Sequence, residues 1–401
     1  MAARVASVFL AAFLTLAACL LANQLFPRSR LCALAVPLII VFHPQLVLVF
    51  SYSNNDVTSS TLAAFMLLLS AHVLRSGLTV KSAAALGVMS GWLLLTKYSG
   101  YAVLPAVATA LLCSLWIHRT SINKFLTCLA LCAVLSLSLS LWWFVRNYQL
   151  FDGDILGIQT MRRQWAVIYS KPLTYFKSPI EIIFELRWWR FLWFSYWGYF
   201  GYLTRPLWRP LYFVYLGFLL SSIGGLIRAL LAWRKARGGS LTSAIAAAIA
   251  CNPADAPGQS VGSTNVPVNA EASGTTGDGS TSLQGCDTAL AAAVIDASAD
   301  SIPGQRLALI QPALWLTMAV CIVANLIAMI WSTTGNVGGP QGRYLFTSEI
   351  PVIASMVAGL SLLKEPWSKR LITGFVAFNI ITYIWACAML LPLYGWHWQA
   401  L

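Results

Sequence analysis

Apolar runs of about 20 residues recur along this chain and limit the folds open to it. Such a run can cross a bilayer as a helix, which pairs its own backbone polar groups. Hydrophobic residues make up 58% of the sequence and charged residues 10%, against roughly 25% charged in a soluble domain. The sequence therefore predicts an all-α fold, a polytopic transmembrane bundle of about ten helices. The expected helices span 4–24, 31–50, 57–75, 82–96, 99–117, 124–145, 210–231, 307–331, 344–363 and 371–393.

The net charge of +13 comes from 26 basic and 13 acidic residues. No basic stretch is interleaved with a nucleic-acid-binding module, so nucleic acid is not expected as a partner. Basic residues instead flank the apolar runs, where they face lipid headgroups, so the expected partner is membrane lipid. Five short loops carry them: Arg28 and Arg30; Arg75 and Lys81; Arg119 and Lys124; Arg234, Lys235 and Arg237; Lys364, Lys369 and Arg370.

With ten helices these loops all fall on one side, assigned as cytoplasmic by the excess of Lys and Arg. The outer side then holds Asp56, Lys97, a long interfacial loop at 146–209 and a loop at 332–343. The N-terminus is also placed outside, although Arg4 favours the inside.

Two further features of the sequence concern the N-terminal run and the cysteines. The letters LAAC at 16–19 resemble a lipoprotein cleavage box, but the apolar run continues through Leu20 and Leu21, which favours a membrane helix. The nine cysteines are scattered without a Cys-x-x-Cys pair, so neither a metal site nor a disulfide framework is indicated.

Residues 238–305 differ in composition from the rest of the chain. They contain six acids, no Lys or Arg, and mostly Gly, Ser, Thr, Ala and Pro. A segment of this kind buries too little apolar surface to offset its ordering entropy. We expect a disordered cytoplasmic linker here, with short helices possible at 241–250 and 289–297, between a membrane unit at 1–237 and C-terminal membrane helices at 306–401.

The outer loop 146–209 is basic and aromatic, as in RWWRFLWFSYWGYFGY at 187–202. One interpretation is an amphipathic or re-entrant segment at the headgroup level. The other is a vestibule in which arginines bind phosphate and rings stack on sugar or polyprenyl groups. The turn Asp152-Gly153-Asp154 could hold a divalent cation, although no cofactor is certain.

Asp56 closes the stretch FSYSNND at 50–56 and is the first acid of the chain. Any residue of 53–56 could be the N-cap of the next helix. A carboxylate at the outer surface could equally serve in catalysis or assist a metal. Arg146 is either a snorkelling residue at a helix end or a phosphate ligand. Arg343 follows the glycine-rich stretch STTGNVGGPQGR at 332–343, either a plain hairpin or an anion contact.

Five motifs occur along the chain in the order known from one enzyme superfamily: Pro44, SNND at 53–56, GVMSGWLLLTKYSG at 87–100, WWFVRNYQLFDGD at 142–154 and GGPQGRYLF at 338–346. Together they resemble the GT-C membrane glycosyltransferases, which include protein O-mannosyltransferases and aminoarabinose lipid-A transferases. The similarity covers most of 4–360 outside the expected linker. It implies a polyprenyl-phosphate sugar as donor, used on the outer face of what is expected to be a bacterial cytoplasmic membrane. The acceptor would be a hydroxyl of a protein, lipid or glycan.

The resemblance also implies roles for particular residues. Asp56 matches a catalytic acid, and Lys97, Arg146 and Arg343 match basic positions that bind the donor phosphate. Asn55, Asp152, Asp154 and Tyr344 would contact substrate on the outer side. Residues 4–24 match the family's second helix, so the first helix and the first outer loop, with its main catalytic acid, are expected to be absent. A truncated or inactive member is therefore one expectation.

Two further functions stay open. A carrier or flippase for lipid-linked sugars would place charges at the midplane in broken helices and show internal repeats. Here the charges cluster near the helix ends and no repeat is evident, which favours an interfacial enzyme. A non-catalytic membrane subunit is the other alternative, because the first outer loop is expected to be missing.

Overall fold

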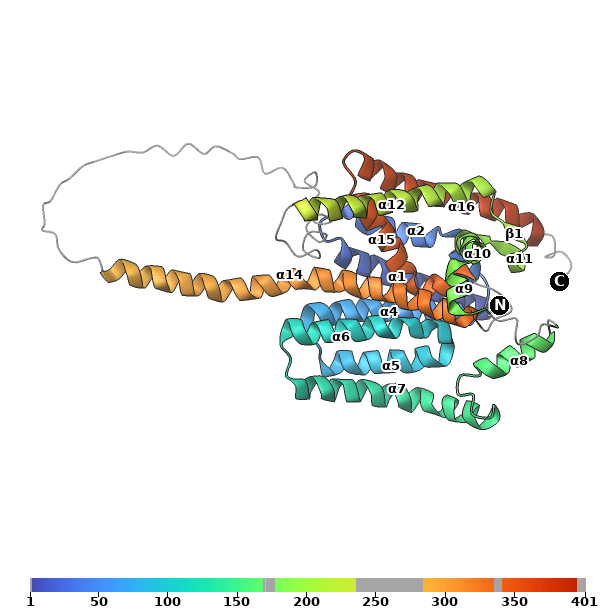
Figure 1. The fold of residues 1–401 in the computed structure, drawn as a ribbon, viewed down its shortest axis with the longest axis horizontal. Helices are drawn as coiled ribbons and strands as arrows, with labels where there is room; N and C mark the ends of the chain where they lie inside the picture. Colours follow the sequence, from blue (N-terminus) through green and yellow to red (C-terminus); the bar gives the residue numbers. More distant parts are fainter. Residues whose placement is uncertain (1, 169, 171–176, 236–283, 335–340, 395–401) are drawn as a thin grey trace, which may run out of the picture.

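The computed structural model describes residues 2–168, 170, 177–235, 284–334 and 341–394, and these residues are almost entirely helical (Figure 1). The predicted all-α bundle is therefore confirmed. In chain order the elements are α1 (Ala2–Leu25), α2 (Arg30–Val41), α3 (Pro44–Phe50), α4 (Asn55–Ser76), α5 (Val80–Thr96), the 3₁₀ helix η1 (Tyr98–Val103), α6 (Leu104–His118), α7 (Ile122–Leu150), α8 (Ile158–Ile168), α9 (Pro179–Phe184), α10 (Leu186–Trp197), α11 (Phe200–Leu203), β1 (Arg205–Pro206), α12 (Arg209–Lys235), α14 (Gln284–Thr333), the 3₁₀ helix η4 (Gly342–Ser348), α15 (Glu349–Ser361) and α16 (Trp367–Tyr394).

Within the described part of the chain, eight helical segments are long and apolar enough to cross a membrane. The bent pair α2 and α3 makes a ninth if it is counted as one span. The remaining expected span corresponds to α5, an apolar helix of 17 residues. The protein is thus an integral, multi-pass membrane protein, and each run expected to be a helix is helical.

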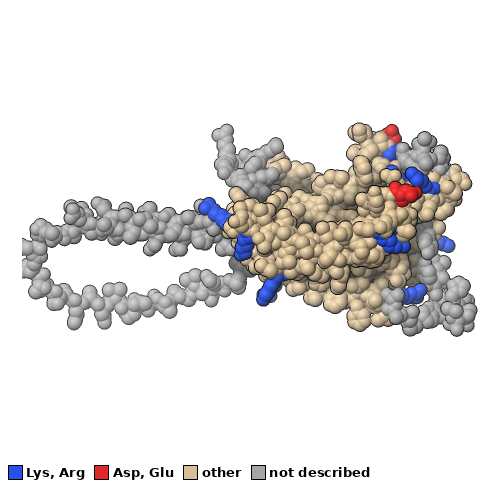
Figure 2. Space-filling view, turned by 90° about the horizontal axis from the view of Figure 1, so that it is seen from below, with Lys and Arg blue, Asp and Glu red and all other residues tan. Residues whose placement is uncertain are grey.

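Successive long helices alternate in direction, so α1 begins and α16 ends at the same end of the bundle (Figure 1). That end also carries the short elements α8 to α11, which form most of the loop 146–209. We call it the outer end. Figure 2 shows a surface without charged residues along the middle of the bundle, with Lys and Arg (blue) towards both of its ends and Asp and Glu (red) towards one of them. This is the distribution that a bilayer around the middle of the bundle requires.

The bend between α2 and α3 is caused by Pro44. Its ring clashes with the carbonyl four residues earlier and removes an amide donor, so α2 ends at Val41 and α3 begins with Pro44 as its first residue. The two axes differ by 55°. His43 lies at the break and is wholly buried.

Small residues allow α5 and α7 to approach closely. A Cβ atom on Gly87 would lie 2.7 Å from the carbonyl oxygen of Cys132, and one on Gly91 would lie 2.9 Å from that of Ser136. The spacing of four residues puts both glycines on one helix face, the arrangement by which membrane helices pack backbone to backbone.

The aromatic stretch 187–202 contributes to the protein interior. Trp197 at the end of α10 is 0% exposed, and its ring stacks on Tyr215 of α12 with centroids 3.8 Å apart. Trp188, Tyr196 and Phe200 are buried as well. α10 therefore packs into the outer end of the bundle.

The segment expected to be a linker, 238–305, is described only from Gln284 onwards, and the division of the chain around it stays a prediction. α14 begins at Gln284, so 284–305 are helical, while 238–283 lie outside the described residues. The physical reason is the alanine-rich run at 289–297, since alanine has the highest helix propensity. Helices on either side of this segment pack together, as α14 does with α6 and α15 with α12.

Candidate functional site

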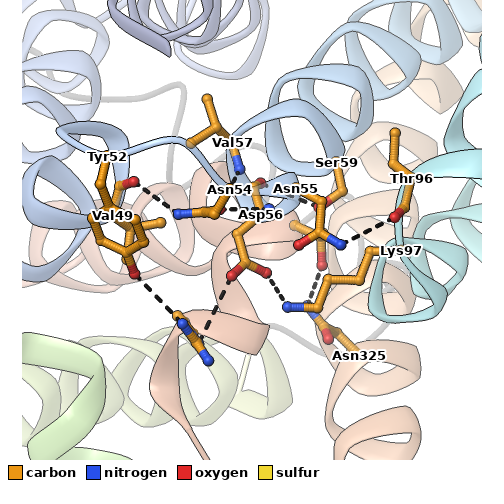
Figure 3. A network of polar contacts seen from close by, with 12 residues as sticks. Val49, Tyr52, Asn54, Asn55, Asp56, Val57, Ser59, Thr96, Lys97 and Asn325 are labelled. Atoms are coloured by element: carbon orange, nitrogen blue, oxygen red, sulfur yellow. Dashed lines mark hydrogen bonds and ion pairs between the residues drawn. The ribbon is translucent and has the colours of Figure 1, made fainter. Parts of the chain in front are cut away.

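The candidate site is built around Asp56 at the outer end of α4. The helix is capped by Asn54, whose side-chain oxygen accepts hydrogen bonds from the backbone N–H groups of Asp56 and Val57 at 2.7 and 3.3 Å. The amide of Asn54 donates to the carbonyl oxygen of Val49 at 3.0 Å. Because Asn54 does the capping, the Asp56 carboxylate is left for other contacts (Figure 3).

Two cations contact that carboxylate. The ammonium of Lys97 donates a short hydrogen bond to Oδ1 of Asp56 (Figure 3). Nε of Arg343 lies 3.8 Å from Oδ2, an ion pair that is too long for a hydrogen bond. The side chains of Asp56 and Lys97 are 5% and 12% exposed, whereas that of Arg343 is 32% exposed. Arg343 is thus the member of the group that a ligand reaches first.

Two tyrosines complete what we call the Asp56 cluster: Asp56, Lys97, Arg343, Tyr52 and Tyr344. Arg343 Nη1 donates to the hydroxyl oxygen of Tyr52 at 3.4 Å. Nζ of Lys97 lies 4.6 Å from the centre of the Tyr344 ring, and the guanidinium of Arg343 lies 5.7 Å from it. Both distances are in the range of cation–π attraction. The cluster therefore holds two cations and one internal counter-charge.

Lys97 lies at the junction of α5 and η1, where it ends the first helix and precedes the second. Burial lowers the pKa of its ammonium group from the ordinary value, and the charge of Asp56 offsets only part of this. The nearby guanidinium of Arg343 lowers the pKa further. An anion beside Lys97 therefore favours its charged form.

The 3₁₀ helix η4 carries Arg343 and Tyr344 and is held by buried polar contacts. The N–H of Gly342 donates to the hydroxyl of Ser195 on α10 at 2.8 Å. Asn325 on α14 donates to the hydroxyls of Thr347 and Ser348 at 2.7 and 2.9 Å. A Cβ atom at Gly342 would collide with the backbone of Tyr196, so only glycine allows η4 to pack this closely on α10.

The structure brings together some of the residues implied by the resemblance to GT-C enzymes and separates others. Asp56, Lys97, Arg343 and Tyr344 form the cluster. Asn55 is adjacent, but its amide donates to the carbonyl oxygen of Thr96 at 3.2 Å.

Arg146, Asp152 and Asp154 lie apart from the cluster. The guanidinium of Arg146 is 5.1 Å from the ring centre of Trp143 on its own helix. Asp154 accepts a hydrogen bond from the N–H of Thr160 at 2.8 Å, and Asp152 occupies a turn at φ 49°. Across the described ranges, no hydrogen bond or ion pair joins these three residues to Asp56 or Arg343.

The cation site considered at Asp152 and Asp154 has only two carboxylates. Among the residues whose placement is described, no group of three or more His, Cys, Asp or Glu side chains is arranged to hold a metal ion. What the Asp56 cluster can do chemically is bind an anion through Lys97 and Arg343 and exchange a proton at Asp56.

A second polar group, which the sequence did not suggest, lies in the interior beyond η4. His43, Glu349 and Tyr196 are buried and hydrogen-bonded to one another. One signal was present: Glu349 lies within an apolar run, where an ionisable residue in a membrane protein usually has a function.

Comparison with protein-family models, with curated proteins and with solved structures finds no match for this chain. The geometry described above therefore carries the functional argument.

Proposed function

We propose that this protein is a membrane glycosyltransferase of the GT-C type that moves a sugar from a polyprenyl-phosphate donor to an acceptor hydroxyl at the outer face of a bacterial cytoplasmic membrane. The observation that carries the proposal is the meeting of Asp56, Lys97 and Arg343 from three separate elements at the outer end of the bundle. A carboxylate beside two cations provides both a base and a phosphate-binding site.

In the proposed reaction the donor phosphate binds to Lys97 and Arg343, while the polyprenyl chain stays in the bilayer. Guanidinium groups suit phosphate because their N–H donors match two of its oxygens. The Nε of Arg343 is buried, lies 3.8 Å from the Asp56 carboxylate and makes no hydrogen bond, so its donor becomes available when the guanidinium turns to such a ligand. Without a ligand, Asp56 pairs with both cations and offsets one of their two positive charges.

Phosphate binding would also prepare Asp56 for catalysis. When the cations turn to the phosphate, the carboxylate of Asp56 is released from them and can accept a hydrogen bond from the acceptor hydroxyl. It can then take the proton from the acceptor hydroxyl. The acceptor oxygen forms a bond to the anomeric carbon, the bond between that carbon and the phosphate oxygen breaks, and polyprenyl phosphate leaves with the electron pair.

One observation favours the alternative of a carrier for lipid-linked sugars. The buried pair of His43 and Glu349 lies at a broken helix, where transporters often place their ion-binding groups. The two functions differ in whether a covalent bond of the donor is broken.

The test uses the protein in lipid nanodiscs with a set of synthetic polyprenyl-phosphate sugars. Release of polyprenyl phosphate, followed by mass spectrometry, together with a glycosylated acceptor supports the enzyme. Intact donor that changes leaflets in proteoliposomes, without release of polyprenyl phosphate, supports the carrier and contradicts the proposal.

The charge of Lys97 gives a prediction about pH. Burial lowers the pKa of its ammonium group. As the pH is raised, donor binding should therefore begin to weaken at a lower pH than it would with an exposed lysine. Lys97→Arg should remove this alkaline loss, because a guanidinium keeps its charge. The measurement is the Kd for polyprenyl phosphate against pH in both proteins. Parallel curves for the two would argue against a phosphate contact at Lys97.

A further inference from the structure

Three side chains from distant parts of the chain meet inside the bundle. Nδ1 of His43 lies 2.7 Å from Oε1 of Glu349, and both side chains are 0% exposed. Nε2 of His43 lies 2.9 Å from the backbone carbonyl oxygen of Tyr196. The hydroxyl of Tyr196 donates to Oε2 of Glu349 at 2.8 Å. All four polar atoms of the imidazole and the carboxylate are therefore engaged.

These contacts fix where hydrogen atoms must be. A carbonyl oxygen has no hydrogen to donate, so Nε2 of His43 carries one. A neutral imidazole protonated at Nε2 has a bare Nδ1, which would face a bare carboxylate oxygen at 2.7 Å. Two acceptors do not approach so closely, so a hydrogen lies between Nδ1 and Oε1. The pair is either imidazolium with carboxylate or imidazole with carboxylic acid.

Either form contains one more proton than neutral histidine and ionised glutamate together, and either form is neutral overall. Neutrality matters because an uncompensated charge in this interior would be costly. The rings of Tyr196, Trp197 and Phe346 surround the imidazole with centroids 4.9, 5.0 and 5.6 Å away. They close the site to solvent and leave the carboxylate as the natural partner of the proton.

The site joins elements that carry the candidate functional site. Glu349 is the first residue of α15 and follows η4 directly, while Tyr196 lies beside Ser195, which binds the start of η4. His43 lies at the break between α2 and α3. Both ends of η4, and hence Arg343 and Tyr344 near its start, are in this way tied to α10 and to the broken helix.

We propose that His43, Glu349 and Tyr196 form a buried proton-binding site that positions η4, so that the hydrogen bonds within this site keep Arg343 facing Asp56. The positioning role rests on the proposed function, in which Arg343 binds the donor phosphate. The bound proton does not, because it follows from the hydrogen-bond geometry alone.

The proton is tested by nitrogen NMR of the full chain in nanodiscs with ¹⁵N-labelled histidine. The His43 signals are assigned by their loss in His43→Asn and by their persistence in His118→Asn. The wild type should show a hydrogen on Nε2 and a hydrogen bridging Nδ1. In Glu349→Gln the bridging hydrogen belongs covalently to the amide, so Nδ1 should lie at the position of an unprotonated, hydrogen-bonded nitrogen. A wild-type His43 without hydrogen on Nε2, or without a hydrogen bridging Nδ1, overturns the proton site.

The positioning role is tested with polyprenyl phosphate as the probe. Glutamine can donate to Nδ1 and accept from Tyr196, so Glu349→Gln should keep the Kd within about threefold of the wild type. Glu349→Ala leaves both partners unpaired and should raise the Kd by about tenfold or more. Equal losses in the two variants would contradict the positioning role. Absence of binding in the wild type itself, with the NMR result as expected, would reject the proposed donor and leave the proton site standing.

Discussion

Asp56→Asn is expected to lower sugar transfer by roughly 10²- to 10⁴-fold, the range that general acid–base catalysis provides. Asparagine has nearly the same shape as aspartate but cannot accept a proton at neutral pH. The cap of α4 comes from Asn54 and stays intact, so the helix should begin where it does now. The measurement is single-turnover release of polyprenyl phosphate from a saturating donor, which separates chemistry from binding.

The same substitution leaves Lys97 without its counter-charge, and this could disturb the fold. Breaking a buried pair costs roughly 3–5 kcal/mol when one charge remains. The double variant Asp56→Asn/Lys97→Met removes both charges and should recover thermal stability without recovering turnover. Glu185→Gln is the matched control, because Glu185 also pairs with a lysine, Lys177 at 2.6 Å, but at the outer end, where Lys177 is exposed and Glu185 only half-buried. It should leave both turnover and stability nearly unchanged. Turnover of Asp56→Asn at the wild-type rate would exclude Asp56 as the base.

The membrane helices and the start of α4 are predicted well from the sequence, because each depends on residues that are close together in the chain. An apolar run of membrane length becomes a helix whatever its neighbours are, because its backbone has no other partners in a bilayer. The stretch before α4 is predictable for the same reason. Short polar side chains at 53–56 predict an N-cap, and in the structure Asn54 is the residue that caps the helix. That selection matters, since a carboxylate already used as a cap would be less free to meet Lys97.

Packing decides the rest, and one sequence cannot display it. Arg146 and Arg343 look alike in the sequence, each near a helix end and within two residues of an aromatic residue. Only the close approach of η4 to α10 and α4 places Arg343 against Asp56, whereas Arg146 stays over Trp143. His43 and Glu349 are 306 residues apart in the chain, so no local pattern connects them. The sequence shows the proline that breaks the helix at His43. It does not show that Glu349 is the partner of His43 at this break.

The difference between the two arginines leads to the second large expected effect. Arg343→Ala should weaken binding of polyprenyl phosphate by roughly 10- to 150-fold, the equivalent of losing a charge-assisted hydrogen bond worth about 1.5–3 kcal/mol. Arg146→Ala should change the Kd by less than about threefold, because its guanidinium makes its contact with Trp143 outside the Asp56 cluster. Arg343→Lys should recover part of the loss, since the charge remains but the planar pair of donors does not. The measurement is equilibrium binding in nanodiscs of fixed lipid composition.

The comparison also distinguishes a phosphate contact from general attraction of the basic outer end. If the net charge of that end governed binding, the two alanine variants would lose affinity equally, and added salt would remove the loss in both. A specific contact at Arg343 predicts a difference that persists at high salt, because the guanidinium is 32% exposed and the ion pairs around it are only partly screened. Equal effects of the two substitutions would therefore contradict binding of the donor phosphate at the Asp56 cluster. They would also contradict the role of Asp56 as the base, because that role requires the donor to bind there.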